Sequence, residues 1–154
     1  MTVIALRPAT RTDSEFCFQL HKAAMGDYVA ANWGWDDKTQ RDHHARAFDA
    51  DPRRWQIISA NGTDIGALQV ERRPEEIYLG RIEIHPDQQG RGFGTRLIRA
   101  LIDEAAQQDQ DLVLEVLGNN ERAQALYRRL GLAEVARTDQ GGHEKITMRS
   151  SRSP

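Results

Sequence analysis

The sequence is poor in several features that mark particular classes of protein. It has one cysteine, Cys17, in 154 residues, so neither an intramolecular disulfide nor a cysteine-based zinc site is available. Lysine and arginine number 21 against 23 acidic residues, a formal charge of -2, which provides no chain-wide basic surface for nucleic acid or acidic lipid. No apolar run approaches the roughly 18 residues of a membrane span. We therefore expect a cytoplasmic protein without nucleic-acid or membrane partners.

The remaining composition, 39% hydrophobic and 29% charged, is that of an ordinary globular protein. The length suits one domain over residues 1–154, and we expect the polar end, residues 149–154, to be a frayed tail. Cys17 shares an apolar stripe with Phe16 and Leu20. Because no activating neighbour is evident, we interpret it as a core residue rather than a nucleophile.

Hydrophobic periodicity and turn residues predict an alternation of strands and helices. The predicted strands cover residues 3–6, 55–59, 65–70, 76–85, 112–116, 132–136 and 145–148. The predicted helices cover 13–32 with Gly26 as a candidate break, 39–48, 96–107, and a fourth that begins at Asn119 or Asn120 and ends at Gly131. In the second helix His43 and His44 are adjacent, so they point too far apart to share a metal ion, and we interpret them as a solvated face.

Three glycines at alternate positions, Gly90, Gly92 and Gly94, follow the longest predicted strand and lead into a helix. Glycines let the backbone approach an anion closely, and a helix N-terminus adds free N–H groups and a positive dipole end. This pattern predicts a phosphate-bearing ligand, and a simple tight turn is the alternative. A dinucleotide fingerprint would need glycine in place of Thr95, and the Gly-Lys-Ser/Thr of a P-loop is absent.

The loop Gln89-Gly90-Arg91-Gly92-Phe93-Gly94 resembles the Gln/Arg-x-x-Gly-x-Gly/Ala signature of the GNAT superfamily of N-acetyltransferases. A second block resembles the family's Asn-x-x-Ala-x-x-x-Tyr-x-x-x-Gly-Phe signature. Its matching residues are Asn120, Ala123, Tyr127 and Gly131, with Leu132 in place of the aromatic residue. The resemblance covers residues 65–148 well and the first 60 residues only loosely.

The resemblance implies an α/β (α+β) fold in a single domain: a mixed, mostly antiparallel central sheet of about seven strands with helices on both faces. It implies acetyl-CoA as co-substrate and no metal. The loop amides would hold the pyrophosphate, and backbone near Ile84 and His85 would bind the pantetheine. The implied cofactor-binding residues are Ile84, His85, Gln89, Gly90, Arg91, Gly92, Phe93, Gly94, Thr95, Asn120 and Tyr127.

Two residues are candidates for catalysis. Tyr127 matches the family tyrosine near the CoA sulfur, where it would act as general acid, unless it is simply a core tyrosine. Glu83 lies where several family members carry the glutamate that deprotonates the amine. A carboxylate between Ile82 and Ile84 is costly to bury, and desolvation would raise its pKa toward a useful base. A salt bridge of Glu83 with Arg81 or Arg7 is the alternative, and Glu115 is the reserve base.

Tyr28, Trp33 and Trp35 form an aromatic concentration that suits either a ligand wall or a helix–helix corner. With Glu83 they are the candidate substrate-binding residues. They favour a small-molecule primary amine as acceptor, with protein N-termini or lysines as alternatives. We expect the amine to attack the thioester of acetyl-CoA directly. The rival from another class is a non-catalytic acyl-CoA-binding module. The resemblance leaves a homodimer open, because family members often dimerise, but the sequence identifies no interface.

Overall fold

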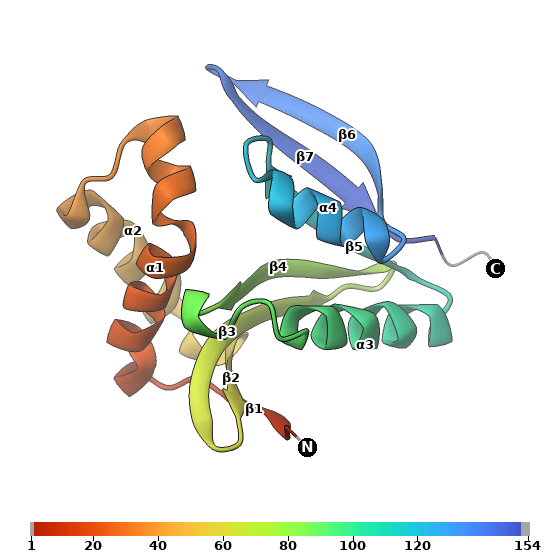
Figure 1. Ribbon diagram of the computed structural model, residues 1–154, viewed down its shortest axis with the longest axis horizontal. Coiled ribbons are helices and arrows are strands. Elements are labelled where there is room, and N and C mark those ends of the chain that lie inside the picture. Colours follow the sequence, from red (N-terminus) through yellow and green to blue (C-terminus); the bar gives the residue numbers. More distant parts are fainter. Residues whose placement is uncertain (1, 152–154) are drawn as a thin grey trace. The chain divides into compact units, whose positions relative to one another are not determined.

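The computed structural model describes residues 2–151, apart from the side chain of Gln140. These residues form four α-helices and seven strands, whose hydrogen-bonded order is β1-β2-β3-β4-β5-β7-β6 (Figure 1). The elements are β1 (Ile4–Pro8), α1 (Ser14–Trp33), α2 (Asp37–Ala50), β2 (Trp55–Ala60), β3 (Thr63–Arg72), β4 (Glu76–Ile84), α3 (Phe93–Gln107), β5 (Asp111–Leu117), α4 (Glu121–Arg129), β6 (Ala133–Gln140) and β7 (His143–Arg149). The chain divides into two compact units.

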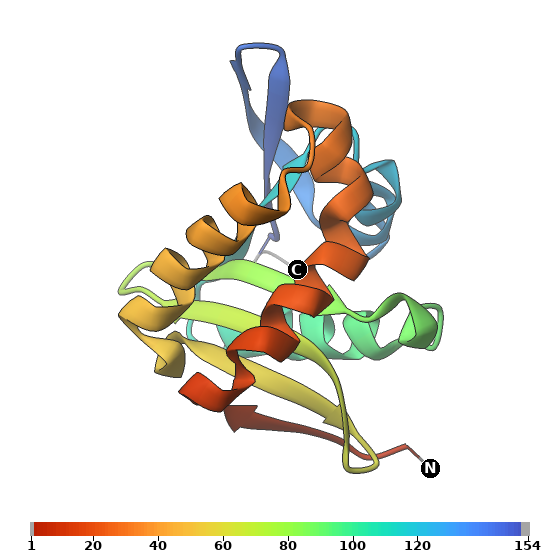
Figure 2. The same cartoon turned by 90° about the vertical axis from the view of Figure 1, so that its left-hand side faces the viewer.

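Unit 1 comprises Met1–Gln69 and Arg81–Arg91. Its strands β1, β2 and β3 pair antiparallel, and Figure 2 shows α1 and α2 lying across one face of them. The core between the helices and this face consists of Ala9, Cys17, Leu20, Phe48, Trp55, Ile57 and Ala67. Since β1 is an edge strand, Pro8 can end it without costing a hydrogen bond of the sheet.

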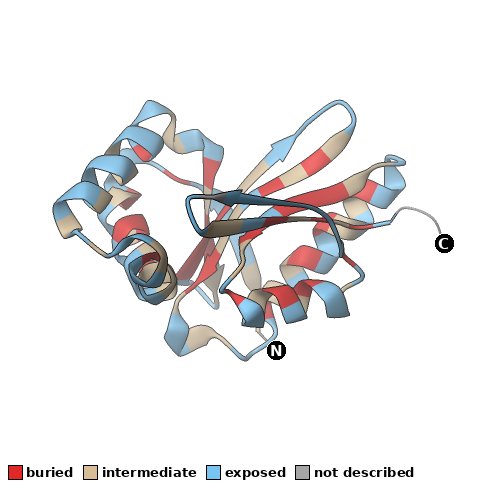
Figure 3. Ribbon diagram, turned by 90° about the horizontal axis from the view of Figure 1, so that it is seen from above, coloured by how far each residue is buried: buried red, intermediate tan, exposed pale blue. Residues whose placement is uncertain are grey.

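Unit 2 comprises Val70–Gly80 and Gly92–Pro154. Here β5 runs parallel to the first half of β4 and antiparallel to β7, which pairs with β6. Leu112, Val113 and Leu114 of β5 are all buried, as expected of a strand covered on both faces. The buried side of α3 carries Phe93, Ile98, Leu101 and Ala105; Figure 3 marks the buried positions in red.

The predicted fold class is confirmed: the sheet is mixed and mostly antiparallel, and every predicted helix and strand is present. Asp36 caps α2 by accepting from the Thr39 amide, and Asn120 caps α4 by accepting from the Ala123 amide. Gly131 follows α4 with a φ of 98°, which is the left-handed conformation expected after a helix end. No helix within residues 2–151 is long and apolar enough to cross a membrane.

Three details differ from the sequence predictions. First, α1 continues through Gly26 without a break, because the buried residues Phe18, Leu20 and Val29 anchor it on both sides. The tail was expected to fray from residue 149, but Arg149 belongs to β7 and Ser150 exchanges hydrogen bonds with Leu112. Residues 152–154 lie outside the described part of the chain.

The third difference concerns the adjacent histidines of α2. His43 is exposed, as predicted, but His44 is half-buried. Its Nε2 lies 3.0 Å from the Ser14 carbonyl oxygen, and its ring stacks on Phe48 at 5.3 Å. Burial lowers the pKa of His44, so its neutral form ties α2 to α1 in place of the predicted solvated position.

Alanine substitutions at two glycines of unit 1 should change the stability of the fold in opposite directions. A Cβ at Gly66 of β3 would come within 2.4 Å of the Glu83 carbonyl oxygen, whereas a Cβ at Gly26 of α1 would meet nothing closer than 4.0 Å. Gly66→Ala should therefore lower the free energy of unfolding by about 1–3 kcal/mol. Gly26→Ala should raise it by about 0.5–1 kcal/mol, since alanine loses less entropy in a helix. Urea unfolding measures both; equal effects would contradict the account.

Candidate active site

The most unusual residue of unit 1 is Glu83, a carboxylate on β4 with 5% exposure. Its Oε2 lies 2.6 Å from Nδ1 of His21 on α1, and its Oε1 accepts from Nη1 of Arg81 at 3.2 Å. The carboxylate cluster thus consists of His21, Arg81 and Glu83. The salt bridge with Arg81 that the sequence left open is therefore present, while Arg7 pairs with Asp13 and Asp64.

Aromatic rings flank the carboxylate cluster. The guanidinium carbon of Arg81 lies 4.6 Å from the centre of the Trp55 ring, a cation–π contact with a fully buried tryptophan. The His21 ring lies 6.2 Å from that of Trp35. These contacts restrict how Arg81 and His21 can turn, so that both keep their polar atoms at the carboxylate.

The ionisation of Glu83 follows from these neighbours. Burial alone would raise its pKa, but the charge of Arg81 and the hydrogen bond with His21 outweigh burial and lower the pKa below the usual range. The raised pKa expected from the sequence is wrong, because that expectation counted desolvation without the two partners. Glu83 is an ionised carboxylate at neutral pH, which is the form that accepts a proton.

Two hydrogen bonds, one local and one to β3, fix the chain between β4 and the glycines. Gln89 donates from Nε2 to the Ile84 carbonyl at 2.9 Å, and the His85 amide donates to the Ile65 carbonyl at 2.8 Å. Of the backbone groups assigned to pantetheine, the His85 amide thus already has a partner. The binding role of Ile84 and His85 stays a prediction.

The glycine loop shows why glycine occurs at two of its three positions. Gly90 and Gly92 have φ angles of 80° and 82°, which residues with side chains rarely adopt. Gly92 is also the N-cap of α3 and offers no side chain to cap that helix. The first N–H groups of α3 are therefore left without a side-chain cap, as an anion-binding helix start requires.

Unit 2 holds the second predicted motif on α4. Tyr127 is 9% exposed, and burial raises the pKa of its hydroxyl to about 12, so the phenol is protonated at neutral pH. Asn120 is equally buried, and its side chain is used as the helix cap. The reserve base, Glu115, is exposed and accepts a hydrogen bond from Tyr78 at 2.9 Å, so it lacks the burial of Glu83.

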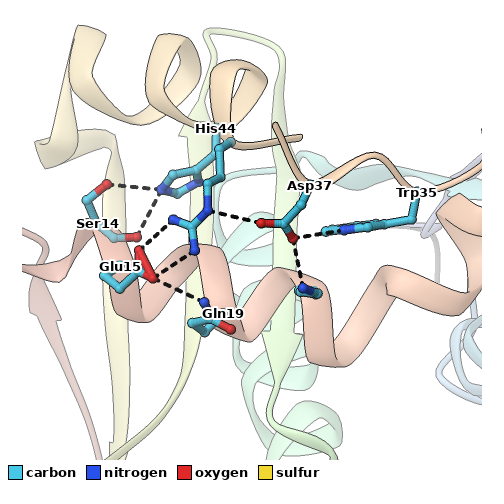
Figure 4. A network of polar contacts seen from close by, with 8 residues as sticks. Ser14, Glu15, Gln19, Trp35, Asp37 and His44 are labelled. Atoms are coloured by element: carbon cyan, nitrogen blue, oxygen red, sulfur yellow. Dashed lines mark hydrogen bonds and ion pairs between the residues drawn. The ribbon is translucent and has the colours of Figure 1, made fainter. Parts of the chain in front are cut away.

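The aromatic residues after α1 divide into two kinds. Trp35 packs 6.3 Å from the Phe18 ring, and its indole donates to Asp37 at 3.2 Å (Figure 4). Trp35 therefore makes the contacts expected of a helix–helix corner, and its role in substrate binding stays a prediction. Trp33 is 54% exposed and Tyr28 is partly exposed, so a ligand wall at these two stays a prediction.

Sequence reasoning missed His21. It is 62 residues from Glu83 in the chain, so no local pattern links the two residues. The available signal was its spacing: His21 follows Cys17 by one helical turn and thus lies on the buried side of α1. Cys17 itself is fully buried and burial raises its pKa to about 12, which confirms its core role.

The chain as a whole is similar to known acetyltransferases. The model of the Acetyltransferase (GNAT) family matches residues 15–132. The N-alpha-acetyltransferase RimI of Mycobacterium tuberculosis is 29% identical over 139 residues, covering 86% of this chain and 80% of that protein.

Solved structures show the same fold. The ribosomal-protein-S18-alanine N-acetyltransferase of Escherichia coli superposes with a TM-score of 0.68 at 24% identity, over 100% of this chain and 96% of that one. The PaiA N-acetyltransferase of Thermoplasma acidophilum, solved with coenzyme A, gives 0.72 at 14% identity, over 97% and 99%. Within residues 2–151 there is no group of three or more residues suited to hold a metal ion.

The lowered pKa of Glu83 predicts how stability changes with acid. A folded-state pKa below the unfolded value of about 4.3 means that the stabilisation is present above this pH and is lost as the pH falls through the folded pKa. Glu83→Gln should be less stable than wild type near neutral pH and lose less further stability between about pH 6 and about pH 3. Urea unfolding across this range, with exposed Glu75→Gln as control, measures the difference; an equal acid loss in Glu83→Gln and wild type would contradict the account.

Proposed function

The chain belongs to the acetyltransferase (GNAT) family, and from this premise we propose that it moves acetyl from acetyl-CoA directly to the α-amine of a polypeptide. Transfer of acetyl from an acyl-CoA to nitrogen is the activity of this family. The observation that carries the proposal for this chain is the ionised, buried carboxylate of Glu83, because a protonated amine must lose a proton before it can attack.

The chemistry requires a base, a held thioester and an acid. An α-amine with a pKa of about 7.7–8.0 is largely protonated at neutral pH. The proposed role of Glu83 is to promote loss of this proton, either as the base itself or by holding the basic group that receives it. The amine nitrogen then attacks the thioester carbon, and the C–N bond forms as the C–S bond breaks. Tyr127 is the proposed donor to the leaving thiolate, a role that suits a phenol kept protonated by burial.

Acetyl-CoA is the proposed ligand of the glycine loop. The φ angle of Gly94 lies outside the left-handed region that favours glycine, and a Cβ there would meet no atom within 4 Å. The fold itself therefore does not require glycine at Gly94. Close approach of a ligand to the first turn of α3 supplies a reason, and the pyrophosphate of acetyl-CoA fits a helix start without a side-chain cap.

The proposed type of acceptor, an α-amine, is inferred from a protein of similar sequence. The protein from Mycobacterium tuberculosis that is 29% identical over most of this chain is named an N-alpha-acetyltransferase, which favours an α-amine over the small molecule expected from the aromatic residues. A small-molecule amine is the second candidate. The exposed ring of Trp33 favours it, since aromatic surface can pack against a ligand, whereas Trp35 is engaged by α1 and α2.

The test of the reaction is thiol release from acetyl-CoA with alanine-initiated peptides, lysine peptides, polyamines and aminoglycosides as acceptors. Wild type should turn over the peptides with a free α-amine. Tyr127→Phe and Glu83→Gln should each lower kcat by about 100-fold or more, the size of a general acid or base contribution. Glu75→Gln, which replaces an exposed carboxylate, is the control and should retain full activity.

Different outcomes separate the alternatives. Turnover of polyamines or aminoglycosides alone would establish the small-molecule acceptor, and acetylation of lysine side chains alone would contradict both candidates. Binding of acetyl-CoA without thiol release for any amine would favour the non-catalytic binding module. Undiminished rates in Tyr127→Phe and Glu83→Gln would contradict the assigned roles.

Gly94→Ala tests the ligand role of the loop separately. The added methyl group has room in the fold, so the free energy of unfolding should be unchanged or slightly higher. Acetyl-CoA affinity measured by calorimetry should fall by about 10-fold or more, since the methyl group would occupy space next to the helix start. Gly62→Ala, in the β2–β3 turn with a φ of 85°, should show the reverse: lower stability and unchanged affinity. Unchanged affinity in Gly94→Ala would exclude close approach at this residue.

A further inference from the structure

Glu83 is poorly placed to meet an acceptor amine itself. Its side chain is 5% exposed, and each carboxylate oxygen is already engaged, Oε2 by His21 and Oε1 by Arg81. Direct contact with an amine would require one of these bonds to break within a buried site, which costs free energy. A group between Glu83 and the amine removes this difficulty.

The geometry identifies which ring nitrogen of His21 carries the hydrogen. Both Oε2 of Glu83, at 2.6 Å, and Nη1 of Arg81, at 3.0 Å, approach Nδ1 of the imidazole. One nitrogen cannot donate to the first and accept from the second at the same time. The contact with Glu83 is shorter and its acceptor is an ionised carboxylate, so we assign Nδ1 as the donor to Glu83. Arg81 then donates to Oε1 of Glu83.

With hydrogen on Nδ1, the lone pair of neutral His21 is on Nε2. In residues 2–151 no hydrogen-bond partner contacts this nitrogen, and the residue is partly exposed, with 21% of its side chain accessible. No unpartnered polar side-chain atom of the described residues is buried, so Nε2 is open to solvent. His21 thus has one nitrogen fixed by the carboxylate and one basic nitrogen available.

We propose that Nε2 of His21 is the atom that receives the acceptor's proton, with Glu83 as the positioning residue that holds Nδ1–H and stabilises the imidazolium. This inference rests on the proposed function. The ammonium gives one proton to Nε2 and becomes a nucleophilic amine. After attack on the thioester carbon the C–S bond breaks and Tyr127 gives its proton to the thiolate. The second proton of the nitrogen passes through solvent to restore the phenol, and Nε2 returns its proton to solvent. The products are the amide, the free thiol and one proton.

The surroundings keep His21 in this orientation. Its backbone is part of the continuous helix α1, and Trp35 lies beside the ring at a tilt of 40°. Arg81 is held by Trp55, so it stays at Glu83 instead of swinging toward Nε2. The competing role for His21 is a purely structural one, in which it only satisfies the buried carboxylate.

The two roles separate in His21→Asn. The asparagine amide can still donate to Glu83, but it has no basic nitrogen. With an alanine-initiated peptide as acceptor, His21→Asn should lower kcat by about 100-fold or more and leave acetyl-CoA affinity unchanged. In His21→Ala, added imidazole should restore much of the rate. His43→Asn, an exposed histidine of α2, is the matched control and should behave as wild type.

The tautomer can be measured without an acceptor. In nitrogen-15 spectra of labelled protein, the neutral His21 ring should carry its hydrogen on Nδ1, and Glu83→Gln should weaken this preference. The opposite tautomer in wild type, with hydrogen on Nε2, would overturn the proposal.

The kinetic outcomes distinguish this proposal from the one on which it rests. No transfer by wild type to any amine would overturn the proposed function and the role of His21 together. Transfer by wild type with an undiminished rate in His21→Asn would overturn the role of His21 alone. A slow His21→Asn enzyme whose alanine counterpart gains nothing from imidazole would assign His21 the structural role.

Discussion

The central constraint on unit 1 is the placement of an ionised carboxylate inside it. Burying a charge without partners would cost several kcal/mol, so Glu83 needs donors from its surroundings. Arg81 comes from two residues earlier on the same strand, and His21 comes from α1. The requirement extends outward: Trp55 holds Arg81, Trp35 lies beside His21, and Gly66 allows β3 to approach the Glu83 backbone.

Local features of the fold could be predicted because they depend on neighbours in sequence. Periodicity located every helix and strand. Helix-end chemistry limited the cap of α4 to Asn119 or Asn120, of which Asn120 is the cap, and predicted the left-handed Gly131. Interactions between distant segments could not. The sign of the Glu83 pKa depends on His21, which is 62 residues away, and the order at Ser150 depends on its bonds to Leu112. A histidine among apolar residues of a helix does not by itself show which distant residue it contacts.

For the site, too, the sequence indicated the family but not the protonation states of the residues. Two motifs were enough to indicate the family, and the matching family model covers both of them. The structure adds the chemical state of the residues: an ionised Glu83, a protonated Tyr127 and an α3 start without a side-chain cap. In the proposed reaction, an ionised Glu83 is the state that favours loss of a proton by the amine, and a protonated Tyr127 is the state that can donate to the thiolate. The aromatic residues say less about the site, since Trp35 also packs against Phe18.

The central claim is direct acetyl transfer from acetyl-CoA to an amine. It is tested most directly by a single-turnover experiment in which excess protein is mixed with acetyl-labelled acetyl-CoA and an alanine-initiated peptide, and the label is followed over time. The account predicts that label passes from acetyl-CoA to the peptide α-amine with none accumulating on the protein. Label that first appears on the protein and then moves to the peptide, or that never leaves acetyl-CoA, would contradict it.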